Sequence, residues 1–168
     1  METGEGANLS VYEEVLKQQV DGIVLSSIFI DDPIYQELVA SGIPFVMFNR
    51  RYSSGGNYIE INDEKAGQLA TNHLLKLGYV KIAWIGGPTH ASTFQGRLSG
   101  YQKAMTSANH PVGYEWIKET DTTELSVVKA VDALLLLDTN RHFRGDRLDC
   151  IILPKLLTAN GVPNPQTL

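Results

Sequence analysis

Polar groups follow three apolar segments of the sequence, and these are the groups best suited to chemistry. Ser26 and Ser27 end the apolar segment 22–27, Asn49 ends the segment 44–49, and the loop 87–95 follows the segment 80–86. All of them are uncharged hydrogen-bonding groups or backbone. They suit a neutral polyhydroxylated or heterocyclic molecule better than a metal or a phosphate. The alternative is that Ser, Asn and Gly stand there because they form turns.

Arg97 is the charged candidate beside these groups. It lies just inside the helix predicted after the loop 87–95, where its guanidinium would offer paired donors to hydroxyl, carbonyl or carboxylate oxygens. The alternative is an exposed arginine paired with a surface acid. On the residues alone both interpretations stay open.

The sequence contains no motif of a cofactor site or of a catalytic site. The turn at 86–88 lacks the Gly-Lys-Ser/Thr of a phosphate-binding loop and the spacing of a dinucleotide fingerprint, and neither Gly-x-Ser-x-Gly nor His-Glu-x-x-His occurs. The four histidines lack metal-type spacing, and the single cysteine, Cys150, excludes a zinc site of several thiolates. His73 is predicted to be a core histidine on the apolar face of its helix. We therefore expect no enzyme, no cofactor and no metal.

Strands and helices that alternate along the chain must position these groups. Apolar runs predict strands at 22–27, 44–49, 58–61, 80–86, 114–118 and 148–153, of which the first two have the pattern of strands buried on both faces. Helical spacing predicts helices at 10–19, 33–40, 64–77, 94–109, 126–138 and 154–159. Asp31, Asp32 and Pro33 are the start signals of the second helix and Gly42 its stop, Asn62 and Asp63 are an N-cap pair for the third, and the third has its apolar face at Ala66, Leu69, Ala70, His73, Leu74 and Leu77. The stretch 139–147 is predicted to be a loop. This order indicates an α/β fold with parallel sheets and helices on both faces. In such sheets ligands bind beyond the carboxyl ends of the strands, where Ser26 and Asn49 stand.

Composition limits the classes of partner. The 168 residues carry 14 Lys and Arg against 19 Asp and Glu, a net charge of -5, and the first 40 residues hold eight acids with Lys17 as their one base. Such an acidic segment is not a basic arm for DNA. No apolar run approaches the ~18 residues of a membrane span, and the N-terminus lacks the pattern of a secretory signal. We expect a cytoplasmic protein with no membrane partner.

Five segments together resemble the lac repressor (LacI/GalR) family. Their order and spacing match its effector-binding domain across about residues 10–105. They are Val20-Asp-Gly-Ile-Val-Leu, Gly42-Ile-Pro-Phe-Val-Met-Phe-Asn, Ala66-Gly-x-x-Ala-Thr-x-His-Leu-x-x-Leu-Gly-Tyr, Lys81-Ile-Ala-Trp-Ile-Gly-Gly-Pro and Arg97-x-x-Gly-Tyr-x-x-Ala.

The resemblance implies a bacterial transcription regulator with a helix-turn-helix domain and a two-lobed effector domain like the periplasmic sugar-binding proteins (type I). Residues 1–61 would be part of the N-terminal lobe and 62–168 part of the C-terminal lobe. The helix-turn-helix domain and the first elements of the N-terminal lobe would precede Ser10 and are absent. DNA would then be bound only through a domain absent here, and the intact protein would be a homodimer.

The resemblance also implies a ligand site in the cleft between the two lobes. Carried over position by position, its residues would be Ser26, Asn49, Thr93 and Arg97, and several family members have Asp where Asn49 stands. The effector would be a sugar or a purine-like molecule. Beyond Ala108 the match decays, and the Asn-Asp segment that usually supplies another effector contact is missing. These departures predict a truncated or rearranged family member.

Three hypotheses follow for the function. The leading one is the effector-sensing portion of a transcription regulator. The rival is a periplasmic sugar-binding protein of a transporter, which shares the fold. The helix with His-Leu-x-x-Leu-Gly-Tyr and the lack of a signal segment favour the regulator. An α/β enzyme is the third hypothesis, and the missing motifs disfavour it.

Overall fold

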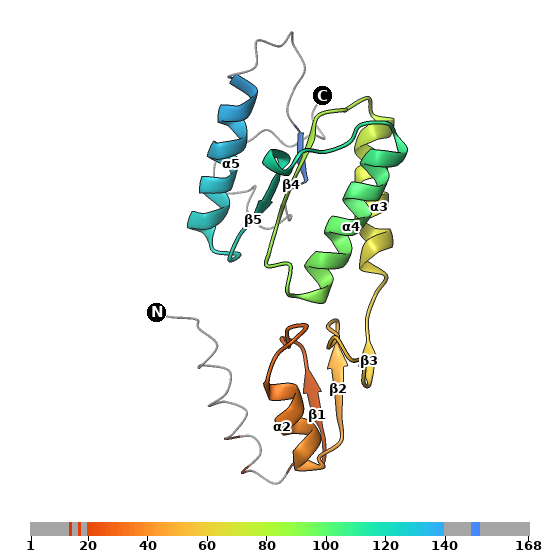
Figure 1. Cartoon of the computed structure of the whole chain (residues 1–168), viewed down its shortest axis with the longest axis vertical. Coiled ribbons are helices and arrows are strands. Elements are labelled where there is room, and N and C mark those ends of the chain that lie inside the picture. The colour runs from red at the N-terminus through yellow and green to blue at the C-terminus, as the bar shows by residue number, and fades with distance from the viewer. Residues whose placement is uncertain (1–13, 15–16, 18–19, 140–148, 152–168) are drawn as a thin grey trace, which may run out of the picture. The chain divides into compact units, whose positions relative to one another are not determined.

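A computed structural model describes residues 14, 17, 20–139 and 149–151 of the chain (Figure 1). The chain divides into two compact units. The first comprises Met1–Ile61 together with His90–Thr93, and the second comprises Asn62–Thr89 and Phe94–Leu168. Each unit is described by itself. The assignment of 1–61 and 62–168 to the two lobes of an effector domain stays a prediction.

The first unit contains a parallel sheet of three strands in the order β1-β2-β3. The strands are β1 (Ile23–Leu25), β2 (Phe45–Phe48) and β3 (Tyr58–Ile59), and helix α2 (Ile34–Ser41) connects the first two. The predicted helix stop at Gly42 is confirmed, whereas the N-cap position of α2 is Pro33 and not Asp31 or Asp32. Asp32 Oδ1 accepts a hydrogen bond of 3.2 Å from the backbone N–H of Ile34, and Gly42, at a φ of 70°, ends the helix in the left-handed conformation that glycine adopts without strain.

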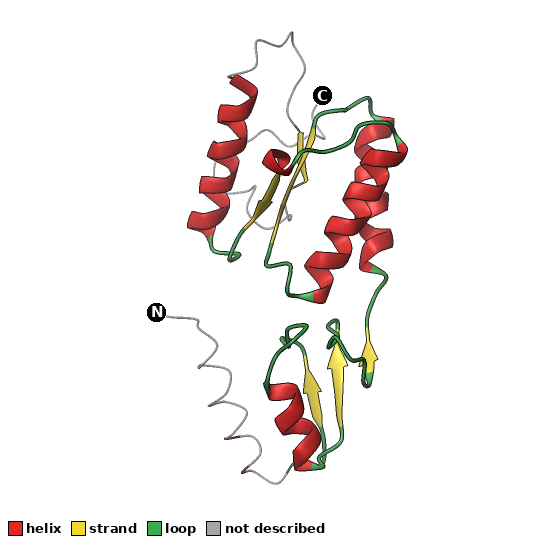
Figure 2. Cartoon of the chain, in the orientation of Figure 1, coloured by secondary structure: helices red, strands yellow, loops and turns green. Residues whose placement is uncertain are grey.

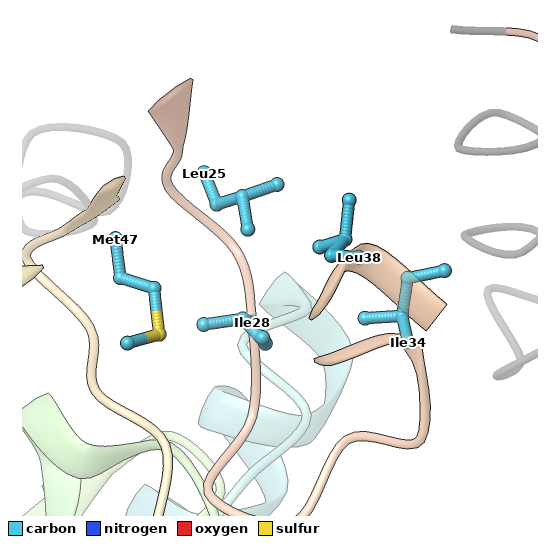
Figure 3. Close-up of a cluster of buried hydrophobic side chains, with 5 residues drawn as sticks. All are labelled: Leu25, Ile28, Ile34, Leu38 and Met47. Carbon is cyan, nitrogen blue, oxygen red and sulfur yellow. The ribbon is translucent and has the colours of Figure 1, made fainter. Parts of the chain in front are cut away.

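The core of the first unit lies between the sheet and α2. Figure 3 shows its five buried side chains turned toward one another, and each is at most 3% exposed: Leu25, Ile28, Ile34, Leu38 and Met47. Because side chains alternate along a strand, the neighbours of these residues face the other way. Val24 and Phe48 are accordingly 70% and 53% exposed. The apolar runs 22–27 and 44–49 predict strands buried on both faces, and for β1 and β2 in the described part of the chain this prediction is wrong. Within the described part of the chain, α2 thus covers one face of this sheet.

The second unit contains another parallel sheet, in the order β5-β4-β6. Its strands are β4 (Ile82–Gly86), β5 (Ile117–Glu119) and β6 (Asp149–Ile151). The helices are α3 (Asp63–Lys76), α4 (Ser92–Ser107) and α5 (Glu124–Thr139), and the first two residues of α4 belong to the first unit.

Strand β4 is buried on both faces. Ile82 and Trp84 pack with two residues of α4, whereas Ala83 and Ile85 pack with two residues of α5. The helical partners are Tyr101 and Met105 in α4 and Ala130 and Leu134 in α5. The predicted α/β class with parallel strands is therefore confirmed, and in this unit helices lie on both faces of the sheet.

Several predicted boundaries differ from the structure by one to three residues. Tyr114–Trp116 forms a 3-10 turn, η1, so that the predicted strand 114–118 begins only at Ile117. Helix α4 begins at Ser92, two residues before the predicted start. The predicted loop 139–147 and helix 154–159, and most of the predicted helix 10–19, lie outside the described residues. Over the described residues, no helix combines the length and the apolar character needed to cross a bilayer.

Candidate functional site

Ser26 and Asn49 come directly after two neighbouring parallel strands. Leu25 of β1 pairs in register with Met47 of β2, so Ser26 and Asn49 both lie just beyond the carboxyl ends of these strands. Ser26 is exposed and Asn49 is half-buried. Asn49 has a φ of 56°, and its backbone N–H donates a 2.7 Å hydrogen bond to the carbonyl of Ile59. Asn is among the few residues that accept this left-handed conformation, so a turn-forming role is established and a ligand contact stays a prediction.

Thr93 lies in the same unit, in the first turn of α4, and is buried with 2% exposure. Its hydroxyl oxygen accepts a hydrogen bond from Nη1 of Arg50, the residue that follows Asn49. Next to it, Ser92 Oγ accepts a 3.1 Å bond from the backbone N–H of Arg51. These two bonds hold the start of α4 to the chain that leaves β2.

His90 connects the segment 90–93 to the loop after β1 through a hydrogen bond and a ring contact. Its carbonyl accepts a 2.9 Å hydrogen bond from the backbone N–H of Ile30, and its ring meets the ring of Phe29 edge-on, with centroids 4.3 Å apart. Residues 90–93 are thus tied to both of the strand ends that carry Ser26 and Asn49.

Arg97 lies in the second unit and forms an ion pair with an acid on the neighbouring helix. Its Nε donates a 2.7 Å hydrogen bond to Oδ1 of Asp63, the first residue of α3. The Asp63 side chain is only 6% exposed, while that of Arg97 is 32% exposed. The partner is thus a buried acid and not a surface acid. A partly exposed guanidinium held at one nitrogen keeps four N–H donors on its other two nitrogens.

Glycines bring α3 and α4 close enough for this pair to form. A Cβ added at Gly67 of α3 would lie 2.2 Å from the carbonyl oxygen of Arg97, and one added at Gly100 of α4 would lie 2.0 Å from the carbonyl oxygen of Glu64. Neither distance leaves room for a side chain. Figure 2 shows the two helices side by side. The glycines therefore favour close helix approach at the expense of local helix propensity.

A second charged contact joins the same two helices. Glu64 Oε2 accepts hydrogen bonds of 2.6 Å from Lys103 Nζ and 3.0 Å from Ser99 Oγ. These bonds, that of Lys103 foremost, lower the pKa of Glu64 below its ordinary value. Two neighbouring acids at the start of α3 are thus each engaged by a cation of α4.

The predicted apolar face of α3 is only partly correct. Leu74 of that face packs against the core of the second unit, together with Leu75. Leu69 and Leu77 are 58% and 59% exposed, and His73, predicted to be a core histidine, is exposed too. Thr71 is buried and donates a 2.8 Å hydrogen bond to the carbonyl of Gly67.

Asp63 is the residue of this site that sequence reasoning missed. It was expected only as part of a helix N-cap pair with Asn62, and the cap itself is confirmed, since Asn62 Oδ1 accepts a 2.8 Å bond from the backbone N–H of Lys65. The available signal was the set of glycines inside two predicted helices, which indicates close helix approach beside the first acid of α3. Across the described residues, no three of the His, Cys, Asp and Glu side chains gather as metal ligands would.

The structure thus places Ser26, Asn49 and Thr93 in the first unit and Arg97 beside Asp63 in the second.

Residues 1–138 match the family described as periplasmic binding proteins and sugar binding domain of LacI family. The chain is 30% identical over 154 residues to the HTH-type transcriptional regulator CelR of Thermobifida fusca, covering 89% of this chain and 45% of that protein. It is 28% identical to the maltose regulon regulatory protein MalI of Escherichia coli, covering 72% and 36%.

Solved structures that resemble this chain are also transcription regulators. A transcriptional regulator CelR–cellobiose complex superposes with a TM-score of 0.68 at 30% identity, covering 76% of this chain and 40% of that one. The regulator CcpA of Lactococcus lactis also superposes at 0.68, with 28% identity over 77% of this chain and 48% of that one. The chain spans less than half the length of these relatives. It belongs to the family of periplasmic binding proteins and LacI-type sugar-binding domains.

Proposed function

We propose that this chain is the effector-sensing portion of a bacterial transcription regulator. A small molecule, a sugar or a purine-like compound, would bind it and shift the DNA affinity of the intact protein. DNA would be bound only through a helix-turn-helix domain of the intact protein. A homodimeric state of the intact protein and a cytoplasmic location are part of this proposal.

The observation that carries the proposal is the match of residues 1–138 to a sugar-binding domain family. The relatives found are transcriptional regulators, and one of them has been solved with cellobiose. This supports a regulator over the transporter protein that shares the fold.

We further propose that Ser26, Asn49, Thr93 and Arg97 contact the effector. Ser26 and Asn49 present uncharged polar groups after β1 and β2, as expected for hydroxyl recognition at the ends of parallel strands. The Thr93 hydroxyl keeps a lone pair beside its bond from Arg50. Arg97 contributes guanidinium donors at a partly exposed position.

Thermal unfolding with a ligand panel tests this function. Neutral sugars such as cellobiose, glucose and maltose, and the purine bases hypoxanthine and guanine, are added to the chain one by one. A ligand at a hundred times its Kd stabilises the folded state by about 2.7 kcal/mol, which raises Tm by roughly 5–10 °C in a chain of this size. A panel that raises Tm in no case would contradict the proposal.

Arg97→Ala should abolish the ligand-induced rise in Tm. Because this substitution leaves Asp63 buried without its cation, the double variant Arg97→Ala with Asp63→Asn is measured beside it, each against its own ligand-free Tm. Lys103→Ala, which removes another cation of α4 that pairs with Glu64, is the control and should keep the shift. An unchanged shift in both Arg97 variants would remove Arg97 from the site.

A further inference from the structure

Asp63 is a buried carboxylate whose one described hydrogen bond within residues 20–139 is the 2.7 Å bond from Arg97. We infer that Asp63 is a positioning residue for Arg97, and that it makes the Arg97 guanidinium prefer uncharged oxygen ligands to anions. The ligand part of this inference rests on the proposed function. The positioning part rests on the geometry of α3 and α4 alone.

The carboxylate itself is held firmly. Asp63 follows the N-cap residue Asn62, so its backbone is fixed by the start of α3. On its other side, a Cβ added at Gly96 of α4 would lie 3.0 Å from Asp63 Cβ, which shows how closely the facing helix packs. A side chain confined by its own helix and by the next one is a rigid acceptor.

A rigid acceptor at Nε orients the whole guanidinium. The guanidinium is planar, and its five N–H bonds point in fixed directions relative to one another. Once the Nε–H of Arg97 is aimed at Asp63 Oδ1, the rotation of the side chain about its last bonds is restricted. The donors on Nη1 and Nη2 are then preset, and a ligand does not have to order them.

The same contact changes the kind of ligand that the guanidinium favours. Asp63 carries one negative charge at hydrogen-bond distance from the positive charge of Arg97, so the pair is neutral as a whole. An anion approaching the Nη donors would meet the repulsion of the carboxylate as well as the attraction of the guanidinium. A hydroxyl or carbonyl oxygen accepts the same hydrogen bonds without that repulsion. The neighbouring charges, Glu64 and Lys103, compensate each other.

A purely structural ion pair would hold the two helices together and do nothing else. It would affect stability, but it would neither orient Arg97 for a ligand nor alter its response to an anion. Two measurements on the full chain separate these roles, one on the Arg97 Nε–H group and one on the binding of inorganic phosphate.

The first measurement is the NMR signal of the Arg97 Nε–H, identified by its loss in Arg97→Lys. In the unsubstituted chain it should exchange with water at least about tenfold more slowly than the Nε–H of a solvated arginine, the factor expected of one charge-assisted hydrogen bond. Asp63→Ala should remove this protection, and Asp63→Asn, whose amide oxygen can still accept the bond but carries no charge, should reduce it. Glu64→Gln, which removes the adjacent negative charge but leaves the Asp63 contact, should retain it. An unprotected Nε–H in the unsubstituted chain would overturn the positioning role even if no variant folds.

The second measurement is the Kd for inorganic phosphate at low ionic strength. Asp63→Asn should tighten phosphate binding by about tenfold, since the guanidinium charge is no longer compensated. Combining Asp63→Asn with Arg97→Ala should remove that gain. The double variant Glu64→Gln with Lys103→Ala, which removes the neighbouring ion pair as a whole, should not produce it. Equal phosphate affinity in the unsubstituted chain and in Asp63→Asn would overturn the preference for uncharged ligands.

The experiments give different results if the proposed function is wrong and if the positioning role is wrong. If the Nε–H protection and the phosphate response follow expectation while no sugar or purine of the panel stabilises the chain, the effector proposal is wrong and the positioning role stands. If the panel stabilises the chain and Asp63→Asn changes neither Nε–H exchange nor phosphate affinity, the positioning role is wrong and the effector proposal stands.

Discussion

Replacing Gly100 by alanine tests whether the close approach of α3 and α4 holds the second unit together. The new Cβ would lie 2.0 Å from the carbonyl oxygen of Glu64 and 2.8 Å from the backbone nitrogen of Gln68. Both neighbours are backbone atoms of a helix, so neither can turn aside as a side chain would. Non-bonded atoms are in contact at about 3.5 Å, so the two helices must move apart by roughly 1 Å or more.

The expected cost is the difference between two opposing effects. Alanine gains about 1 kcal/mol over glycine inside a helix. Overpacking a closely packed contact costs about 1–3 kcal/mol, sometimes more, and moving the helices apart also stretches the hydrogen bonds from Lys103 and Arg97 to α3. Since the clash involves backbone, we expect the upper part of this range and a net loss of about 2 kcal/mol in the free energy of unfolding.

Gly96→Ala is the matched control in the same helix. It gains the same helix propensity, but its Cβ would lie 3.0 Å from Asp63 Cβ, a contact relieved by a shift of a few tenths of an ångström. Its free energy of unfolding should stay within about 1 kcal/mol of that of the unsubstituted chain.

Urea unfolding followed by tryptophan fluorescence measures the stability of the second unit, in which both substitutions lie. Both tryptophans of the chain, Trp84 and Trp116, lie in the second unit, and Trp84 is buried with 4% exposure. A loss of about 2 kcal/mol lowers the urea midpoint by about 1 M at a typical slope. If Gly100→Ala unfolds at the same or a higher urea concentration, or if Gly96→Ala loses as much as Gly100→Ala, the clash argument is refuted.

Two further predictions concern polar contacts of the second unit. Tyr101→Phe removes the 2.6 Å hydrogen bond from the buried Tyr101 hydroxyl to the Ile82 carbonyl, and the same urea assay should show a loss of about 1–2 kcal/mol. The pKa of Asp121 is lowered to about 2 because Ser126 and Thr123 donate hydrogen bonds to its carboxylate. A folded pKa below the ordinary value stabilises the protein above about pH 4, and this stabilisation is lost as pH falls through about 2. An NMR titration should give that low midpoint, and Ser126→Ala should raise it.

Local signals were sufficient to predict most of the elements. Gly42 ends α2 and Asn62 caps α3 as expected, because capping depends on residues within a few positions of one another. The run 80–86 is predicted to be a strand, and β4 forms within it. Features decided by neighbours in sequence are therefore visible in the sequence.

Features decided by distant packing were not visible. The spacing of Leu69, His73 and Leu77 predicts the buried face of α3, yet all three are exposed. The face is chosen by how closely α4 can approach, and that depends on glycines of both helices. Likewise, Tyr114 favours a strand by type, but it is 90% exposed in the 3-10 turn that precedes β5.

In the candidate site too, local features could be predicted and contacts between distant residues could not. Ser26 and Asn49 could be predicted because ending a strand is a local property, whereas Asp63 could not, because it meets Arg97 across 34 positions of sequence. That meeting requires Gly67, where a side chain would strike the Arg97 carbonyl. The glycine therefore has two effects at once: it permits the helices to touch, and it brings a carboxylate to the guanidinium. The ion pair between Arg97 and Asp63 is thus a consequence of helix packing.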